Sequence, residues 1–229
     1  MIYRGMAARL PKFLRDYVLA FETRAEQEVG RFAASLEAGA RVLDAGAGEC
    51  RHASFFARQR YVSADLGVGD ACWDYHKLDV VADLARLPFS AGSFEAGLNV
   101  VTLEHVREPR RVVEEMARVV KPGGRILLVV PQEWEIHQAP HDYYRYTRYG
   151  LRYLVESAGL EVERIEPVGG FFRLLARRML NALQFFPGVF FLPAALLFAP
   201  AALVLPWLDH LDRDRNFTLG YICWARKPS

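Results

Sequence analysis

Two aspartates and two glycines stand where they could hold a nucleoside-like ligand. Asp44 ends a short apolar run, and Gly46 and Gly48 follow it in the segment V-L-D-A-G-A-G-E-C. Glycines lack the Cβ atoms that would keep the backbone away from a ligand, and they permit a tight turn into the next element. Asp65 ends a second apolar run, at a place where a carboxylate can accept hydrogen bonds from both hydroxyls of a ribose. Together these residues predict a ligand crevice at one edge of a sheet.

Two other interpretations of this segment remain open. An ordinary strand-to-helix turn also uses glycine, although the second carboxylate favours a ligand site. A dinucleotide site requires a third glycine in G-x-G-x-x-G, and the chain has Arg51 at that position. Asp44 would repel a pyrophosphate but can anchor an ammonium group. S-adenosylmethionine carries an ammonium and a sulfonium and no phosphate, so it fits these residues better than NAD does.

A histidine-containing segment, Glu133–Thr147, follows an expected strand and can cover the methyl group of such a ligand. Methyl transfer is an in-line displacement, so alignment does most of the work, and a base is needed only if the acceptor must lose a proton. Because imidazole titrates near neutral pH, we predict three histidines to be catalytic, as a base or by positioning the acceptor: His105, His137 and His141. Hydrogen bonding within the loop is the alternative role.

Three neighbouring residues, Tyr143, Tyr144 and Arg145, are predicted to bind the acceptor. Aromatic packing under a lid is the alternative for the two tyrosines. Asp142 and Arg145 also suit a structural ion pair that shapes the loop, and Thr147 suits a helix N-cap.

Short apolar runs alternate with helical segments, which predicts a parallel sheet covered on both faces. The expected strands are 41–44, 61–65, 78–81, 94–100, 125–130, 161–168 and 217–225, and the expected helices between them are 51–58, 110–120 and 149–157. Lys121–Gly124 is expected to close the second of these helices. The fold class is therefore α/β, a doubly wound, mostly parallel, seven-stranded Rossmann-like sheet.

Composition favours a globular intracellular protein. The chain has 229 residues, 52% of them hydrophobic and 24% charged, with a net charge of +2. Its cations are dispersed, so we expect no nucleic-acid partner. The three cysteines form no C-x-x-C pair, so we expect no metal site and a reducing cytoplasmic location. Arg15 and Asp16 interrupt the N-terminal apolar residues, which argues against a secretory signal.

The resemblance to a known family lies in two segments. V-A-D-L-A-R-L-P-F-S-A-G-S-F-E-A-G-L-N-V-V-T-L-E-H-V and E-M-A-R-V-V-K-P-G-G-R resemble the type 11 family of class I S-adenosylmethionine-dependent methyltransferases, over about residues 41–168. The resemblance implies S-adenosylmethionine as cofactor, with S-adenosylhomocysteine as product. By it, Asp44, Gly46 and Gly48 form the first cofactor motif and Asp65, followed by Leu66, holds the ribose. Asp83 and Leu84 flank the adenine, and Val100, Val101 and Thr102 line the sulfonium side. Cys50 departs from a frequent glycine and Glu95 from a frequent aspartate, which puts the shape of the turn and the support of the fourth strand in question.

A long apolar segment, Phe185–Leu208, precedes the last expected strand. It is long enough to cross a bilayer, which needs about 20 apolar residues, but its prolines interrupt helical hydrogen bonding. A single crossing also could not return the chain to the sheet. Peripheral membrane contact, favoured by arginines on both flanks, is preferred here to a lid over a lipid-like acceptor or to a subunit interface in a homodimer.

These observations predict one methyltransferase domain over 1–229: a helical lead-in (1–40), a cofactor-binding core (41–168), an apolar helical insertion (169–216) and a last strand with its tail (217–229). The predicted reaction is methyl transfer to a hydroxyl or similar nucleophile of a small molecule, glycan or lipid-linked acceptor, at the inner face of the cytoplasmic membrane. Residues 137–147 match H-x-x-P-x-D-Y-Y-R-Y-T, which resembles a branch of the family found in bacterial surface-glycan and lipid-linked pathways. The alternatives are a non-catalytic cofactor-binding assembly protein at the membrane and an NAD-dependent oxidoreductase.

Overall fold

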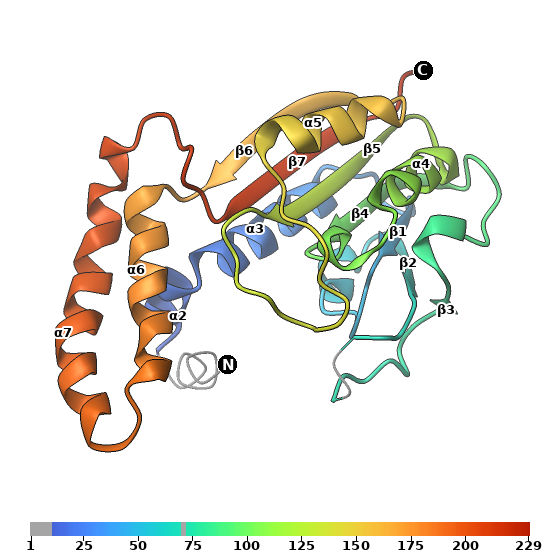
Figure 1. Cartoon of the computed structure of the whole chain (residues 1–229). Helices are drawn as coiled ribbons and strands as arrows, with labels where there is room; N and C mark the ends of the chain where they lie inside the picture. Colours follow the sequence, from blue (N-terminus) through green and yellow to red (C-terminus); the bar gives the residue numbers. More distant parts are fainter. Residues whose placement is uncertain (1–10, 70–71) are drawn as a thin grey trace. The chain divides into compact units, whose positions relative to one another are not determined.

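A computed structural model describes residues 11–69 and 72–229, so the first ten residues of the predicted lead-in lie outside the described part (Figure 1). Its contacts divide the chain into two compact units. The hairpin unit comprises the chain up to Arg24 together with Pro167–Gly220. The sheet unit comprises Ala25–Glu166 and Tyr221–Ser229.

Seven strands form one sheet in the order β3-β2-β1-β4-β5-β7-β6. They are β1 (Arg41–Ala45), β2 (Arg60–Asp65), β3 (Val80–Val81), β4 (Phe94–Val100), β5 (Val120–Pro131), β6 (Glu161–Val168) and β7 (Gly220–Arg226). The pairs β1–β2, β1–β4, β2–β3 and β4–β5 are parallel. The chain therefore starts at β1, moves to one edge and returns to extend the sheet from β4, which places the reversal of strand order between β1 and β4. This confirms the predicted α/β sheet with a helical insertion before its last strand.

Helices cover the sheet as their apolar residues require. The helices of the sheet unit are α4 (Pro109–Val119) and α5 (Arg148–Ser157), with the 3₁₀ turns η1 (Ala53–Phe56), η2 (Leu84–Arg86) and η3 (Leu103–His105). Proline at the first position of α4 suits a helix start, because its missing N–H would have no helical partner there. Val112, Val113 and Met116 of α4 are buried in the core against the sheet.

Several predicted elements differ from the structure. The strands expected over 78–81 and 217–225 begin later, at Val80 and Gly220, and the strand expected over 125–130 begins earlier, at Val120. The helix expected over 51–58 is only the short turn η1. Lys121–Gly124 does not close a helix but lies inside β5, because α4 ends at Val119 and Val120 is already extended. The predicted N-cap is present: the Thr147 side chain accepts a hydrogen bond from the Gly150 N–H at 3.1 Å.

The remaining helices include α2 (Lys12–Val18) and α3 (Ala20–Ala34) near the N-terminus. The predicted insertion, residues 169–216, forms α6 (Phe171–Ala182), the turns η4 (Leu183–Phe185) and η5 (Gly188–Phe190), α7 (Phe191–Val204) and η6 (Leu205–Leu211). Helices α6 and α7 run side by side as a hairpin (Figure 1). Among the described residues, Gly188–Leu211 is the one helical segment whose length and composition would allow it to cross a membrane.

Both ends of this hairpin are tied together. Asp209, near the end of η6, accepts hydrogen bonds from the N–H groups of Gly170 and Arg173 at 2.9 and 3.0 Å. Asp212 accepts one from the N–H of Phe171 at 2.8 Å. These carboxylates satisfy donors that the first turn of α6 leaves without helical partners, and they suit the positive end of its dipole. The chain thus enters and leaves the hairpin at one place.

Candidate functional site

Thr102, which follows β4, packs closely against the glycine turn after β1. Gly46 has a φ of +94°, which favours glycine, and its carbonyl accepts a hydrogen bond from the Thr102 hydroxyl at 3.1 Å. A Cβ on Gly46 would overlap the Thr102 side chain. Gly48 also has a positive φ, +52°. Thr102, two residues after the end of β4, is therefore in direct contact with the predicted first motif. This contact lies at the reversal of strand order, where open α/β sheets bind ligands.

Asp44, two residues before Gly46, keeps one buried oxygen without a hydrogen-bond partner among the described residues. Its side chain is fully buried, and its Oδ2 accepts a hydrogen bond from the Tyr61 hydroxyl at 2.6 Å. His52 Nδ1 lies 3.4 Å from the same oxygen. Oδ1 has no hydrogen-bond partner among the described residues. Burial and the neighbouring carboxylate raise the pKa of Tyr61 well above its usual range, so the tyrosine stays a donor. A buried carboxylate oxygen without a hydrogen-bond partner can accept hydrogen bonds from the ammonium group of an amino-acid ligand.

Asp65 is held in place at the tip of β2 by main-chain donors. The N–H groups of Gly48 and Gly67 donate to its two oxygens at 3.0 and 2.7 Å. Each carboxylate oxygen has two lone pairs, so hydroxyl donors of a ribose can still bind. The turn after β1 and the end of β2 thus share one carboxylate, and its binding of a ribose stays a prediction.

The predicted adenine and sulfonium residues follow the neighbouring strands. Asp83 caps η2 by accepting from the Ala85 N–H at 2.9 Å, and Leu84 is buried behind it. Leu66 is exposed, after the end of β2. Val100 is the last residue of β4, and Val101 takes a φ of +54°, which turns the chain toward η3. The structure brings these residues to the ends of the first strands, and their ligand contacts stay predictions.

The histidines gather around a carboxylate that the sequence prediction did not include. Glu104, in η3, is fully buried, and its Oε1 lies 3.7 Å from His105 Nε2 and 4.0 Å from His137 Nε2. His137 comes from the loop after β5. Burial raises the pKa of Glu104 to about 8 and lowers that of His105. The signal for Glu104 was its place between Leu103 and His105 directly after β4, but burial of one glutamate cannot be read from spacing.

His141 is placed differently from the other two histidines. Its carbonyl accepts from His105 Nδ1 at 2.6 Å, while its own ring contacts the Tyr143 hydroxyl at 3.1 Å. Its side chain therefore faces away from the glutamate, and its catalytic role stays a prediction.

The predicted acceptor-binding residues have structural partners in the loop. Arg145 donates to both oxygens of Asp142, at 2.6 and 2.9 Å, as the ion-pair alternative supposed. Burial would raise the pKa of Asp142, but hydrogen bonds from Arg145 and from the His137 N–H lower it to about 2. Tyr143 accepts from Arg107 Nε at 3.2 Å, and Tyr144 donates to the Arg107 carbonyl at 3.0 Å. The loop is thereby ordered, with the two tyrosines still partly exposed.

Comparisons with known proteins find methyltransferases among the proteins that this chain resembles. A family model described as "Methyltransferase domain" matches residues 43–128. The demethylmenaquinone methyltransferase of Paenarthrobacter aurescens (strain TC1) is 32% identical over 126 residues, which is 52% of this chain and 50% of that protein. The tRNA (carboxymethyluridine(34)-5-O)-methyltransferase of Arabidopsis thaliana is 31% identical over 108 residues, which is 45% of this chain and 27% of that protein. The chain thus spans half or less of the length of these curated relatives.

A solved structure shows the same fold. It is the 1,6-didemethyltoxoflavin-N1-methyltransferase of Burkholderia thailandensis, with bound 1,6-didemethyltoxoflavin and S-adenosylhomocysteine. It matches with a TM-score of 0.57 and 16% identity, over 95% of this chain and 86% of that chain.

Proposed function

We propose that this chain, a class I S-adenosylmethionine-dependent methyltransferase by its family match and its fold, methylates a hydroxyl or similar nucleophile of a small acceptor. The observation that carries the proposal is the pair of carboxylates at adjacent strand ends. Asp44 leaves a buried oxygen beside the glycine turn, and Asp65 is fixed at the tip of β2. The first suits the ligand's ammonium and the second its ribose hydroxyls. Bound there, S-adenosylmethionine supplies an electrophilic methyl group on a cationic sulfur.

The remaining predicted residues are proposed to bind the adenine and the sulfonium end of the cofactor. Asp83 and Leu84 are assigned to the adenine and Val100–Thr102 to the sulfonium side. Thr102 supports this assignment, because its hydroxyl is bonded to the glycine turn itself. The hydrogen bond keeps the end of β4 and the turn after β1 at a fixed separation.

The acceptor is assigned to the other side of Thr102. Glu104 and His105 lie in η3, two and three residues after this threonine, and His137 reaches Glu104 from the loop after β5. Since displacement at the methyl carbon depends on alignment, groups that fix the acceptor oxygen contribute most. His105 and His137 are proposed to position that oxygen, while Tyr143 and Tyr144, exposed on the same loop, line its approach.

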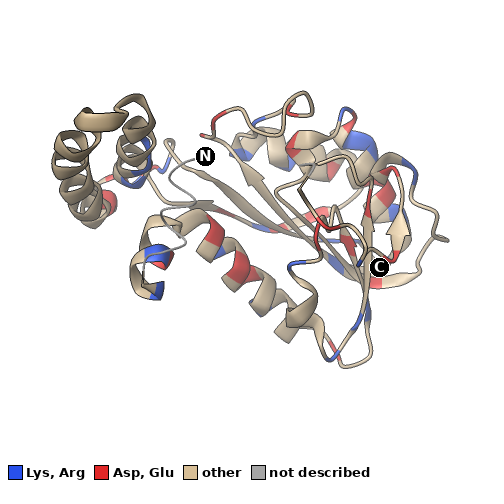
Figure 2. Ribbon diagram, turned by 90° about the horizontal axis from the view of Figure 1, so that it is seen from below, with Lys and Arg blue, Asp and Glu red and all other residues tan. Residues whose placement is uncertain are grey.

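A lipid-linked or glycan acceptor at a membrane surface is supported by helix α7. One face of this helix exposes only apolar side chains, and they recur at helical spacing: Leu192, Pro193, Leu196, Leu197, Pro200, Leu203 and Val204. Figure 2 draws α7 without a charged residue along its length. Gly188–Leu211 as a whole is long enough to cross a bilayer, whereas α7 alone, with 14 residues at 1.5 Å each, is about 21 Å long, less than the roughly 30 Å hydrocarbon core. A hairpin of this length with both ends at one place suits insertion into one leaflet.

The arginines that flank the hairpin contribute less than the sequence suggested. Arg173 and Arg215 pair with Asp209, and Arg177 pairs with Glu22 at 3.2 Å. Arg213 is exposed near the hairpin's end. Membrane contact is therefore proposed to rest mainly on the apolar face, and attraction to anionic headgroups adds to it.

The test is a calorimetric titration of S-adenosylmethionine together with radiolabel transfer into cell-envelope lipid and glycan fractions. Asp65→Ala should weaken cofactor binding by about 1–3 kcal/mol, because it removes the acceptor for two hydroxyls. Asp65→Asn keeps one oxygen and the side-chain volume and should weaken it less. Glu163→Ala, on β6, is the matched control and should leave the affinity unchanged.

The outcomes separate the three functions. Unchanged affinity in Asp65→Ala contradicts the ribose assignment. Tight binding without transfer to any fraction favours the non-catalytic assembly protein. Binding of NAD in place of S-adenosylmethionine favours the oxidoreductase.

A further inference from the structure

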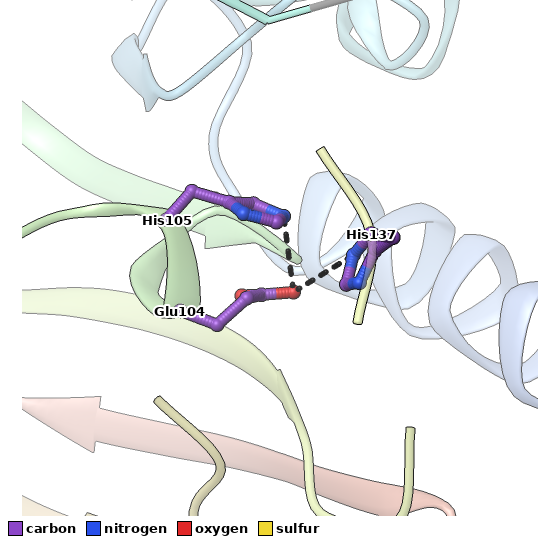
Figure 3. Close-up of side chains that lie close together, drawn as sticks. All are labelled: Glu104, His105 and His137. Atoms are coloured by element: carbon purple, nitrogen blue, oxygen red, sulfur yellow. Dashed lines mark ion pairs between the residues drawn. The ribbon is translucent and has the colours of Figure 1, made fainter. Parts of the chain in front are cut away.

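Three side chains of the types that bind metal ions lie close together. Glu104, His105 and His137 each offer a ligand atom, and these atoms all lie within 4.8 Å of one another (Figure 3). Two of the side chains come from η3 and one from the loop after β5. In Figure 3 both imidazoles are joined by dashed lines to the same carboxylate oxygen.

Main-chain carbonyls set the tautomers of the two histidines. His105 Nδ1 lies 2.6 Å from the carbonyl of His141, and His137 Nδ1 lies 3.1 Å from the carbonyl of Glu135. A carbonyl oxygen only accepts hydrogen bonds, so each Nδ1 carries the proton and each Nε2 carries a lone pair. Both Nε2 atoms face Glu104. Histidines that bind metals are oriented in this way, with the second ring nitrogen donating to an oxygen.

Several polar atoms at the centre of this cluster have no hydrogen-bond partner among the described residues. Neither carboxylate oxygen of Glu104, nor Nε2 of His105, has a hydrogen-bond partner in the part of the chain that the structure describes. At 3.7 and 4.0 Å, the oxygen and the two nitrogens are too far apart to bond one another. Glu104 and His105 thus keep buried atoms without hydrogen-bond partners among the described residues, at the place where the three ligand atoms come together. A cation is the species that satisfies such a set.

The spacing is close to that of a tetrahedral centre. Bonds of about 2.0–2.2 Å to nitrogen and oxygen place neighbouring ligands roughly 3.4 Å apart. The two distances to the Glu104 oxygen, 3.7 and 4.0 Å, exceed this value, and all three ligand atoms lie within 4.8 Å of one another, so side-chain rotation must bring them closer when a metal binds. Imidazole ligands favour Zn²⁺ and its transition-metal neighbours over Mg²⁺ and Ca²⁺, which prefer oxygen alone.

We propose that Glu104, His105 and His137 bind one divalent transition-metal ion of the Zn²⁺ type, with an open coordination position for the acceptor oxygen. The site itself stands without the proposed function, whereas the role of the open position rests on it. A hydroxyl bound there has a lowered pKa and releases its proton to water. The oxygen then forms a bond to the methyl carbon as the carbon–sulfur bond breaks, and that electron pair stays on sulfur.

The test is metal binding by the purified full chain. Protein stripped with a chelator is loaded with Zn²⁺, passed through gel filtration and analysed for metal; parallel titration with Co²⁺ is followed by visible absorption. The wild type is expected to retain about one Zn²⁺ per chain. His105→Ala, His137→Ala and Glu104→Gln should each weaken Co²⁺ binding at least tenfold. His141→Ala is the matched control: its ring faces Tyr143, its main-chain support of His105 remains, and its affinity should equal the wild type's.

Each outcome decides one question. Failure of the wild type to bind Zn²⁺ and Co²⁺, or equal binding in the three ligand variants, overturns the site. Circular dichroism and thermal unfolding check that the variants fold, and Glu104→Gln preserves side-chain volume if a histidine variant does not. Calorimetry with S-adenosylmethionine on the same samples keeps the two proposals apart. Metal without cofactor binding contradicts the proposed function alone, and cofactor without metal binding contradicts this site alone.

Discussion

At the scale of single residues, Gly46 combines two demands that can be separated by experiment. It has a positive φ, and any side chain there would meet Thr102. Gly39 has a similar φ of +79° but nothing within 4 Å of the position where a Cβ would be. The two positions therefore differ in crowding and share the backbone requirement.

Gly46→Ala should lower the free energy of unfolding by about 2–4 kcal/mol, since it adds overlap with Thr102 to the 1–2 kcal/mol that a left-handed conformation costs. Gly39→Ala should cost only about 1–2 kcal/mol. Urea unfolding measures both, and the double variant Gly46→Ala with Thr102→Gly should recover part of the loss. Equal losses at the two glycines would show that contact with Thr102 is unimportant.

The sequence predicted those site residues whose position follows from strand ends. Asp44 and Asp65 close apolar runs, and parallel strands bring such ends to one edge, so their proximity follows from the pattern. Glu104 could not be found in this way, because its burial depends on the fold of the loop after β5. That loop is held by Asp142 and Arg145, and the sequence did indicate a structural ion pair between them.

At the scale of elements, the exposed apolar face of α7 allows membrane contact to be tested by mutation. Leu192, Leu196 and Leu203 are exposed on one face of α7, and full burial of such a side chain is worth about 1.5–3 kcal/mol. Changing all three to Ser should reduce flotation with phosphatidylglycerol-containing liposomes more than tenfold. The matched control, Tyr149→Ser with Tyr153→Ser, removes two equally exposed rings from α5 and should leave flotation unchanged. Undiminished flotation of the α7 variant would contradict membrane contact through this face.

The elements that the sequence placed well are those with an uninterrupted pattern. Phe94–Val100 and Glu161–Val168 have the predicted bounds, because apolar residues and turn signals coincide at their ends. Lys121–Gly124 has the residues of a helix stop, yet it lies inside β5. It falls in a register shift between the pairs Phe94–Val120 and Ala96–Arg125, which only tertiary pairing reveals.

At the scale of the whole molecule, the insertion leaves the sheet and returns to it at neighbouring positions. The Leu219 N–H donates to the Val168 carbonyl at 3.1 Å, so the chain ends on either side of the helices are already joined. All predicted cofactor residues lie in the sheet unit. The helical insertion is therefore separable in principle from cofactor binding.

Replacing residues 170–217 with a short Gly-Ser linker should preserve S-adenosylmethionine affinity within about threefold, since loop closure between adjacent ends costs little. The same variant should lose flotation with liposomes. Calorimetry and flotation on one preparation measure both. Loss of cofactor binding in a variant that still unfolds cooperatively would show that the insertion supports the crevice.

The buried oxygen of Asp44 affects how stable the folded chain is in a cell when its ligand is absent. A folded chain that keeps an unsatisfied acceptor gains stability when a ligand arrives, by an amount that grows with ligand concentration. Small changes in stability alter how often a chain unfolds and meets proteases. If S-adenosylmethionine is that ligand, as proposed above, the abundance of the protein should fall when methionine is scarce, which quantitative immunoblotting of starved cells would measure.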